Sequence, residues 1–325
     1  DNSQLNAGNA LTQVRALAAQ DAQVQRDRVR ALVFTALRET GRDANKADSG
    51  YAGDFARGYA ALDLVFPGIG EKNQNGSFKN YQGDINLFAS RIKTERGGNV
   101  EFMVPGGDLI VGLANTPGSL VNVGSNVLGI VAAADGDIKG FSRGNMLVNQ
   151  SRILTVGGGD VMLWSSEGDI DAGKGKKTAS AVPPPIIKVD SQGNVTLELQ
   201  GAASGSGIGA LSSGGVTAGD VDLIAPKGTV NAGDAGIRAG NLNIAALVVL
   251  GADNISVSGR SAGTPVADTS AVTASASGAT SGGDDVSKTT AALSQSAADS
   301  AKTAQTLKDA FKPSFVRVEV LGFGE

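Results

Sequence analysis

The first part of the chain carries apolar residues at the spacing of a helix. Between Asn9 and Thr40 glycine and proline are absent, and apolar residues recur at steps of mostly three and four positions. The members of this stripe are Leu11, Val14, Ala18, Ala22, Val29, Leu32 and Ala36. We predict a helix that buries the stripe. Its charged surface, which we expect to be solvated, contains Arg15, Arg26, Arg28, Arg30 and Arg38 among acidic residues.

A second, short helix is predicted by four residues spaced four, three and four positions apart. They are Phe55, Tyr59, Leu62 and Phe66. The helix should end at Pro67-Gly68, because proline cannot continue a helix and glycine favours its C-terminal end. We expect its aromatic stripe to pack on a neighbouring element rather than to hold a ligand.

From Gly83 to Gly259 the pattern changes to short alternations of apolar and polar residues, which are typical of β-strands. Many of them open with glycine, then Asp or Asn, then an apolar residue. These motifs start at Gly83, Gly98, Gly107, Gly136, Gly144, Gly159, Gly168, Gly193, Gly219 and Gly240. Glycine tolerates left-handed backbone, and Asp and Asn bond the nearby main chain. Each motif therefore predicts a turn that leads into a strand.

The intervals between these motifs predict the fold class. The sets Gly83-Gly98-Gly107 and Gly144-Gly159-Gly168 both step by 15 and then 9 residues, and later steps are 25, 26 and 21. A repeat of this length with several short strands is typical of a solenoid. We predict a mainly β fold, a right-handed parallel β-helix (solenoid), with N-terminal helices and a C-terminal helix plus strand as cap. The Leu-rich ladder of a leucine-rich repeat is missing, and a β-sandwich does not repeat at this interval.

Changes in composition predict four segments. They are a helical segment at 1–68, the parallel β-helix at 69–260 with an exposed loop at 174–188, a low-complexity mobile loop at 261–288, and an amphipathic helix and terminal strand at 289–325. The exposed loop contains three consecutive prolines, which favour a stiff extended segment. The mobile loop consists mainly of Ser, Ala, Thr, Gly and Asp. The last segment has apolar residues at alternating steps of four and three and stops at Pro313.

Composition limits the chemistry of the chain. Its 325 residues contain no histidine and no cysteine, which excludes histidine-based catalytic systems and the common structural zinc ligands. The net charge of −4 argues against a nucleic-acid partner. The longest apolar run, Ile244 to Leu250, is too short to span a membrane. The chain begins at Asp1 without a recognisable leader, so we expect it to be part of something longer.

Acidic residues at i, i+2 are the remaining candidates for catalysis. The pairs are Asp135 with Asp137, Asp169 with Asp171, and Asp220 with Asp222. On a strand each pair lies on one face, and glycosidic cleavage uses paired carboxylates. However, each pair includes the Asp of a Gly-Asp turn, so a structural role is favoured. The nonapeptide repeat that stacks calcium ions is absent. We therefore predict no catalytic, cofactor-binding or metal-binding residues.

The chain resembles the C-terminal region of filamentous haemagglutinin family exoproteins. The resemblance covers roughly residues 51–325. It rests on the Gly-Asp-Ile repeats, including Gly168 to Gly175, on the stretch from Gly219 to Arg238, and on the terminal sequence from Pro313 to Glu325 with its Gly-Phe-Gly-Glu ending. The resemblance implies a secreted β-helical fibre of the Gram-negative cell surface, exported by an outer-membrane two-partner transporter.

The predicted function is therefore that of a non-enzymatic, secreted or cell-surface adhesin, or of a biofilm-matrix fibre domain. Its partners would be a host or neighbouring-cell surface glycan or protein, or a matrix polysaccharide. A self-assembling filament subunit is the alternative, in which homo-assembly uses an exposed edge. A β-helical enzyme that acts on polysaccharides through its Asp pairs is the third hypothesis.

Overall fold

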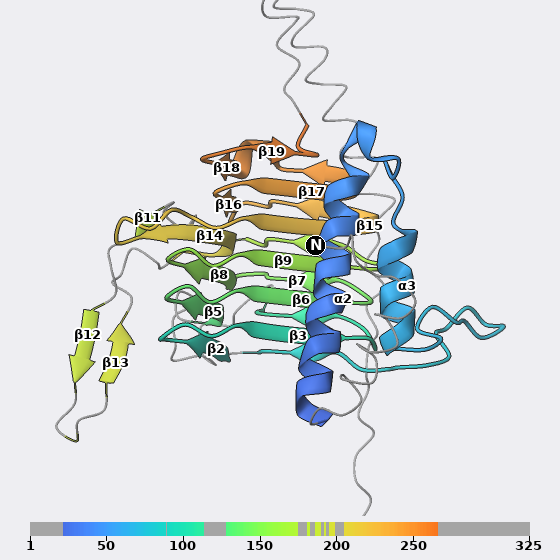
Figure 1. The fold of residues 1–325 in the computed structure, drawn as a ribbon, viewed down its shortest axis with the longest axis horizontal. Helices are drawn as coiled ribbons and strands as arrows, with labels where there is room; N and C mark the ends of the chain where they lie inside the picture. Colours follow the sequence, from blue (N-terminus) through green and yellow to red (C-terminus); the bar gives the residue numbers. More distant parts are fainter. Residues whose placement is uncertain are drawn as a thin grey trace, which may run out of the picture. The chain divides into compact units, whose positions relative to one another are not determined.

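The computed structural model describes residues 22–88, 90–113, 128–174, 181–182, 186–189, 192, 195–198 and 205–265. All of them belong to one compact unit, Asp1–Pro265. The described part is mainly β, with parallel strands in two sheets and few helices (Figure 1). The predicted helix and strand at 289–325, and most of the predicted loop at 261–288, lie outside the described residues.

In the described residues, two α-helices and two short 3-10 helices accompany the sheets. They are α2 (Ala22–Ala44), η2 (Ala47–Ser49), α3 (Ala56–Val65) and η5 (Ala252–Asn254). The start of the predicted first helix, before Ala22, lies outside the described residues. The second helix forms as predicted and ends just before Pro67, where the Phe66 N–H bonds the Leu62 carbonyl.

Most of the described strands fall into three series of parallel neighbours. The first contains β1 (Ile85–Asn86), β4 (Leu109–Ile110), β7 (Met146–Leu147) and β10 (Ile170–Asp171). The second contains β2 (Arg91–Thr94), β5 (Gly129–Ala133), β8 (Arg152–Val156), β14 (Gly207–Ser213), β16 (Ile237–Ala239) and β18 (Ile255–Val257). The third contains β3 (Val100–Val104), β6 (Ile138–Ser142), β9 (Val161–Ser165), β15 (Val221–Asn231), β17 (Leu242–Leu250) and β19 (Ser261–Ala262).

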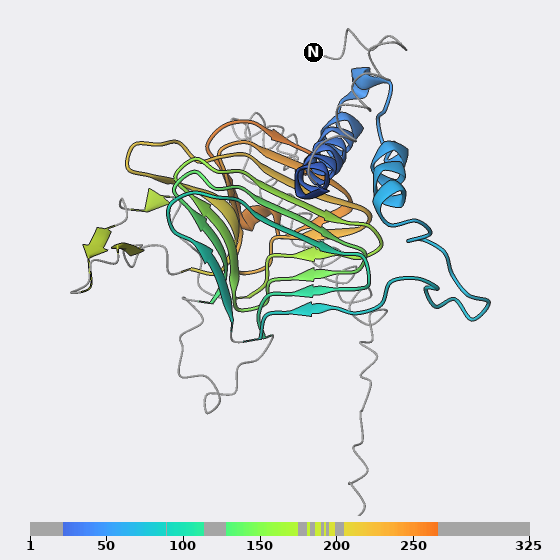
Figure 2. The ribbon, with the colours of Figure 1, turned by 60° about the horizontal axis from the view of Figure 1, so that its bottom comes forward.

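The chain visits the three series in turn, and each visit places a strand in parallel on the preceding member of its series (Figure 2). We call one such round a layer and name it after its strand in the third series. The long strands β15 and β17 also continue the first series, because Val230 pairs with Ile170 and Val249 with Val230. This continuation joins the first and third series into one sheet of ten strands, and the second series belongs to a sheet of seven.

Aliphatic side chains at the same register form the main core. One column contains Val100, Ile138, Val161, Val221 and Leu242, and another contains Ile130, Ile153, Ile208 and Ile237. All of these side chains are buried. Stacking of branched aliphatic residues fills a narrow interior without large rings, as the low aromatic content of 4% predicts.

One part of the predicted spacing is wrong. Val161 pairs with Val221 and Ile170 with Val230, so stacked strands are 60 residues apart at this point. The predicted steps of 25 and 26 residues through Gly193 are therefore not layer intervals. Instead, β12 (Ile186–Val189) and β13 (Val195–Glu198) pair antiparallel, and β11 (Ala181–Val182) pairs with β14. The range 174–188, which was predicted to be a loop, thus includes strand residues; sequence spacing alone does not distinguish an insertion from a layer.

The last layer extends further than predicted. Ser261 and Ala262, which were assigned to the mobile loop, form β19 and pair in parallel with Leu242 and Asn243. Their small side chains gave no apolar signal, but the main-chain bonds of the layer include them. The Leu242 N–H donates to the Arg260 carbonyl at 2.8 Å.

The helices cover the outer side of the third series, on which α2 crosses several layers (Figure 1). The buried residues of this interface are Val33, Phe34, Leu37 and Leu62 from the helices, with Phe141, Met162, Trp164, Ile224 and Ala245 from the sheet. The predicted buried stripe of α2 is wrong: Val29 is 40% and Leu32 is 67% exposed. The helix carries two apolar stripes, and the bulkier one, which includes Phe34, contacts the sheet.

Close contact between α3 and the sheet depends on a glycine and on the single tryptophan. A side chain at Gly58 would overlap the Trp164 ring. Tyr59 packs edge-on against that ring with centroids 5.7 Å apart, and its hydroxyl donates to the Ser166 carbonyl at 2.6 Å. The aromatic stripe of α3 therefore packs on a neighbouring element, as predicted.

Candidate functional site

The Asp residues of the Gly-Asp turns connect successive layers. In most of these turns the side-chain oxygen of the Asp or Asn accepts a hydrogen bond from the main-chain N–H of the corresponding turn in the next layer. In the turns that lead into the third series, Asn99 accepts from Asp137 at 3.0 Å, Asp137 from Asp160 at 3.0 Å, and Asp160 from Asp220 at 2.8 Å. In the turns of the first series, Asp84 accepts from Asp108 at 2.8 Å, Asp108 from Asn145 at 2.7 Å, Asn145 from Asp169 at 2.9 Å, and Asp169 from Thr229 at 2.7 Å. The repeated Asp and Asn residues therefore form two ladders of inter-layer bonds.

These ladders change the interpretation of the motif glycines. We predicted that the glycines supply left-handed backbone, but a positive φ occurs at Gly83 and Gly98 and not at Gly136, Gly159 or Gly219. At these last three positions a Cβ atom would collide with a main-chain oxygen of the preceding layer. Glycine is needed there because the turns of adjacent layers lie almost in contact.

The three candidate catalytic pairs are used in local and inter-layer contacts. Asp137, Asp169 and Asp220 belong to the ladders described above. Asp171 accepts from the Gly173 N–H at 2.6 Å and from the Asn231 amide at 3.1 Å. Asp135 lies in an exposed turn with φ of 67°. The other member of this pair, Asp137, accepts its ladder bond from the Asp160 N–H. The hydrogen bonds of Asp137, Asp169, Asp171 and Asp220 give these four side chains structural roles.

Helix α2 places a row of polar side chains against the layers. Arg30 bonds Glu101 of β3, Arg38 bonds Asp160 at 3.2 Å just before β9, and Arg42 bonds Asp220 and Asp222 of the β15 layer. Asn45 then donates to the Asn243 side chain of β17 at 2.8 Å and to the Ile244 carbonyl at 2.7 Å. The prediction that the arginines of this helix form a solvated face is therefore wrong for Arg30 and Arg38.

The geometry of helices and sheets explains why this row fits. Four residues of an α-helix advance about 6 Å, and neighbouring strands lie about 4.8 Å apart. A helix that crosses the strands thus presents about one turn to each layer. Arg38, Arg42 and Asn45 follow this spacing and contact three successive layers. The row fixes the position of α2 along the stack.

The Arg42 contact contains the most deeply buried charge of this row. The Asp222 side chain is 1% exposed and receives two bonds from Arg42, both of 2.8 Å. Hydrogen bonds to Asp222 raise the pKa of Arg42 even though burial opposes this. Burial raises the pKa of Asp222, and the two bonds from Arg42 counteract that rise. Loss of Arg42 would leave this buried carboxylate without the cation that bonds it.

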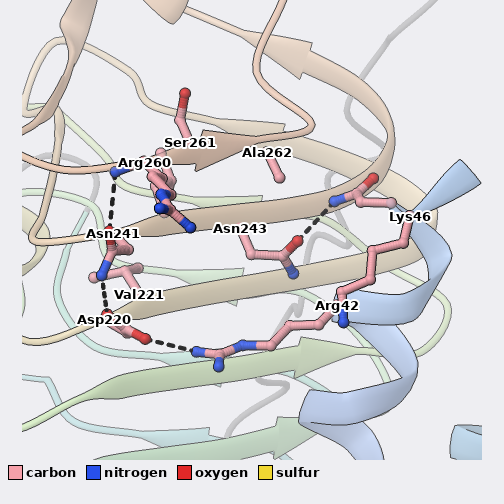
Figure 3. Close-up of a pocket in the computed structure, with 11 residues that line it drawn as sticks. Arg42, Lys46, Asp220, Val221, Asn241, Asn243, Arg260, Ser261 and Ala262 are labelled. Atoms are coloured by element: carbon pink, nitrogen blue, oxygen red, sulfur yellow. Dashed lines mark hydrogen bonds and ion pairs between the residues drawn. The ribbon is translucent and has the colours of Figure 1, made fainter. Parts of the chain in front are cut away.

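A groove lies between the end of α2 and the last two layers of the third series (Figure 3). Its volume is about 550 Å³. Its lining includes Arg42, Asn45, Lys46, Asn241, Asn243 and Arg260. The groove brings together several polar and charged side chains from around the end of α2 and from the last layers, which makes it the candidate binding site.

Sequence reasoning did not single out Arg42, Asn45, Asn243 or Arg260. Two signals could have found them. Arg30, Arg38 and Arg42 recur at multiples of four along one helix, and the motif Gly219-Asp-Val-Asp returns as Gly240-Asn-Leu-Asn. Neither signal has a meaning before the register of helix and layers is known.

The described residues contain neither a cluster of metal ligands nor a helix that could span a membrane. They contain no group of three or more acidic, histidine or cysteine residues placed to hold a metal ion. In the same residues, every helix is too short or too polar to cross a membrane.

Comparison with known proteins places the chain beside one family. No curated protein and no solved structure matches it. Residues 158–266, which run from the turn before β9 to just beyond β19 and include most of the groove, match the family described as "Filamentous haemagglutinin family outer membrane protein". The resemblance inferred from the Gly-Asp repeats and from the stretch between Gly219 and Arg238 is thereby confirmed for these residues.

Proposed function

We propose that this chain is a non-enzymatic domain of a secreted or cell-surface adhesin or biofilm-matrix fibre, and that its layers form a right-handed parallel β-helix. The observation that carries the proposal is the in-register stacking of three strand series, joined by the two ladders of Asp and Asn side chains. The match of residues 158–266 to a haemagglutinin family supports it.

The physical logic of this proposal is that a stacked body provides long, rigid side faces. Each layer bonds mainly to its neighbours, so layers can be added without changing the existing ones. Such a body is suited to an extended fibre on a Gram-negative surface, exported by an outer-membrane two-partner transporter. Its attachment partners would be glycans or proteins of another cell, or a matrix polysaccharide.

An attachment assay tests the proposal. The purified 325-residue chain is coupled to beads, and binding to bacterial and host cells and to immobilised glycans is counted. Beads that carry an unrelated protein of similar net charge are the control, because they report non-specific adsorption. We expect the chain to increase attachment or aggregation severalfold over the control. Equal counts for both kinds of bead on every surface would remove the basis of the proposal.

A second function, self-assembly into a filament, is favoured by the first layer. Strands β1, β2 and β3 each pair with a strand on one side only within the described residues. Phe88 and Ile92 near this edge are 45% and 40% exposed. Open strand edges bind further strands readily. Another chain could add to this edge by main-chain bonds.

Sedimentation and electron microscopy over a wide concentration range test self-assembly. Ile92→Lys places a charge at the open edge and should reduce any assembly. Lys79→Gln, in the exposed segment before β1, is the control for a change in surface charge. Monomers at all concentrations would reject this second function, and so would assembly that Ile92→Lys leaves unchanged.

A further inference from the structure

Two adjacent layers have the same backbone but different charges in the groove. Asp222 of β15 pairs with Asn243 of β17 in the parallel register, and the Asn241 amide donates to Asp220 at 2.8 Å. From one layer to the next, two carboxylates are thus replaced by two amides. The column continues from Asp220 through Asn241 to Arg260, whose main-chain N–H donates to the Asn241 side-chain oxygen at 2.9 Å. The charge along this column changes from negative to neutral to positive.

The cations of the groove are not balanced in the same way. Arg42 is held by the two carboxylates of the β15 layer. Arg260 is exposed, and its guanidinium makes no ion pair or hydrogen bond with the described residues. Lys46, just after α2, has a side chain that is 65% exposed and contacts Asp43 of α2 at 3.2 Å. Arg260, just before β19, and Lys46, just after α2, therefore place cations in the groove beside the β17 layer, whose groove-lining residues Asn241 and Asn243 carry no carboxylate.

Asn243 adds a buried donor to these cations. Asn243 is 8% exposed, and its side-chain oxygen accepts a hydrogen bond from Asn45. Its side-chain nitrogen has no hydrogen-bond acceptor. Because Asn45 fixes the oxygen, the orientation of the amide is also fixed. A buried donor without an acceptor is unfavourable unless a ligand or solvent satisfies it. In Figure 3 the side chain of Arg260 lies beside Asn241, and Asn243 lies between Arg260 and the α2 side of the groove.

We propose that this groove binds the carboxylate of an acidic saccharide through Arg260 and Asn243. In the layer below, Asp222 pairs with Arg42; in the β17 layer the ligand supplies the corresponding carboxylate. Planar guanidinium groups suit carboxylates because two N–H groups can bind both oxygens. The side chains of Asn45, Asn241 and Ser261 line the same groove and provide donors and acceptors for sugar hydroxyls. This mixture of groups favours a saccharide over an acidic peptide. The inference rests on the proposed attachment function and specifies its ligand class.

Calorimetric titration of the full 325-residue chain with trigalacturonate tests the inference. Galactotriose, which lacks the carboxylates, and a triglutamate peptide are the other probes. We expect trigalacturonate to bind at least tenfold more tightly than either. Equal binding of galactotriose would overturn the role of the carboxylate. Equal or tighter binding of triglutamate would overturn the saccharide assignment, and so would the absence of trigalacturonate binding.

Two variants locate the site. Arg260→Gln removes the unpaired cation, and Asn243→Asp places a carboxylate of the protein where that of the ligand is expected. Each should weaken trigalacturonate binding at least tenfold. Arg26→Gln removes the same charge from an exposed position of α2 outside the groove and should leave binding unchanged. Binding that Arg260→Gln and Asn243→Asp leave intact, or that Arg26→Gln weakens equally, would overturn the assignment to the groove.

We expect both groove variants to unfold at the same temperature as the unchanged chain, which thermal unfolding measures, and cell attachment is measured in parallel. Attachment that persists in a chain that does not bind trigalacturonate overturns only the inference about the groove. Loss of attachment by every chain, including the unchanged one, overturns the proposed function itself.

Discussion

The β15 and β17 layers differ mainly in how they treat charge. Both begin with a glycine that lies against the turn below, and both place an apolar column in the core. The β15 layer binds Arg42 with Asp220 and Asp222, whereas the β17 layer offers Asn241 and Asn243 and is followed by Arg260. The comparison indicates that stacking and surface chemistry are separate properties of a layer. The backbone of a layer can stay the same while its outward side chains change from paired charges to groups that can bind a ligand.

The largest expected effect comes from removing the cation of the β15 layer. Arg42→Met leaves Asp222 buried without its counter-ion, and unpaired buried charges of this kind cost about 3–5 kcal/mol. We expect a loss of about 3 kcal/mol in the free energy of unfolding. Urea titration followed by the fluorescence of Trp164, the only tryptophan, measures it.

The matched variant is Asp222→Asn, which copies the residue of the β17 layer. It should cost less than Arg42→Met, because Arg42 is a third exposed and keeps Asp220 as partner. The double variant should be more stable than Arg42→Met alone. A double variant as unstable as the sum of the two single ones would contradict the pairing.

The two layers should respond equally to a change in their shared frame. Gly219→Ala and Gly240→Ala both place a methyl group against main-chain oxygens of the layer below. Overpacking of this kind costs about 1–3 kcal/mol. We expect both variants to lose about 2 kcal/mol in urea titrations. Gly215→Ala, at a φ of 84° with open space around it, should lose about 1 kcal/mol, the cost of left-handed backbone. A large difference between positions 219 and 240 would show that charge and stacking are not separable.

A smaller effect is expected where α2 meets the β17 layer. Asn45→Ala removes the donors to the Asn243 oxygen and to the Ile244 carbonyl. Each of these two hydrogen bonds contributes about 1 kcal/mol net, so we expect the free energy of unfolding to fall by about 1–2 kcal/mol. Hydrogen exchange near β17 should increase at the same time, since this contact holds the end of α2. The same exchange rates in the variant and the unchanged chain would indicate that the contact adds little.

The smallest expected effect is a pH dependence of the carboxylate ladder. Burial of Asp137 favours its protonated form, but the bond from the Asp160 N–H and the 2.9 Å ion pair with Lys139 outweigh this and lower the pKa of Asp137. Because the folded pKa lies below the unfolded value of about 4, this stabilisation is present above about pH 4 and is lost as the pH falls through the folded value. An Asn in the same ladder position does not titrate, so its bond lacks this pH dependence.

Acid titration of Asp137→Asn measures this effect. The variant should lose less stability than the unchanged chain between about pH 5 and about pH 2. Asp135→Asn, a change of equal charge in the exposed turn, is the control and should follow the unchanged chain. If both variants show the same acid dependence, the ladder is not its source.

The sequence predicted the mainly β class, the Gly-Asp turns, the two N-terminal helices and the family likeness, because each depends on local chemistry. Strand alternation, turn residues and helix breakers act over a few positions and leave a readable pattern. The same reasoning gave the wrong intervals around Gly193 and the wrong face of α2. An insertion has the same local pattern as a layer, and a helix with two apolar stripes does not indicate which one finds a partner.

Many stacking partners were decided only in the tertiary structure. Val161 meets Val221 across 60 residues, and Arg42 meets Asp222 across 180. The sequence determined which residues can form turns, strands and ladders, since these are properties of single residues and short segments. Whether a carboxylate is neutralised, as at Asp222, or an amide is left without an acceptor, as at Asn243, depends on the register between α2 and the layers. That register arises because the rise of one helical turn is close to the spacing between neighbouring strands. The two spacings meet only when the helix packs on the sheet.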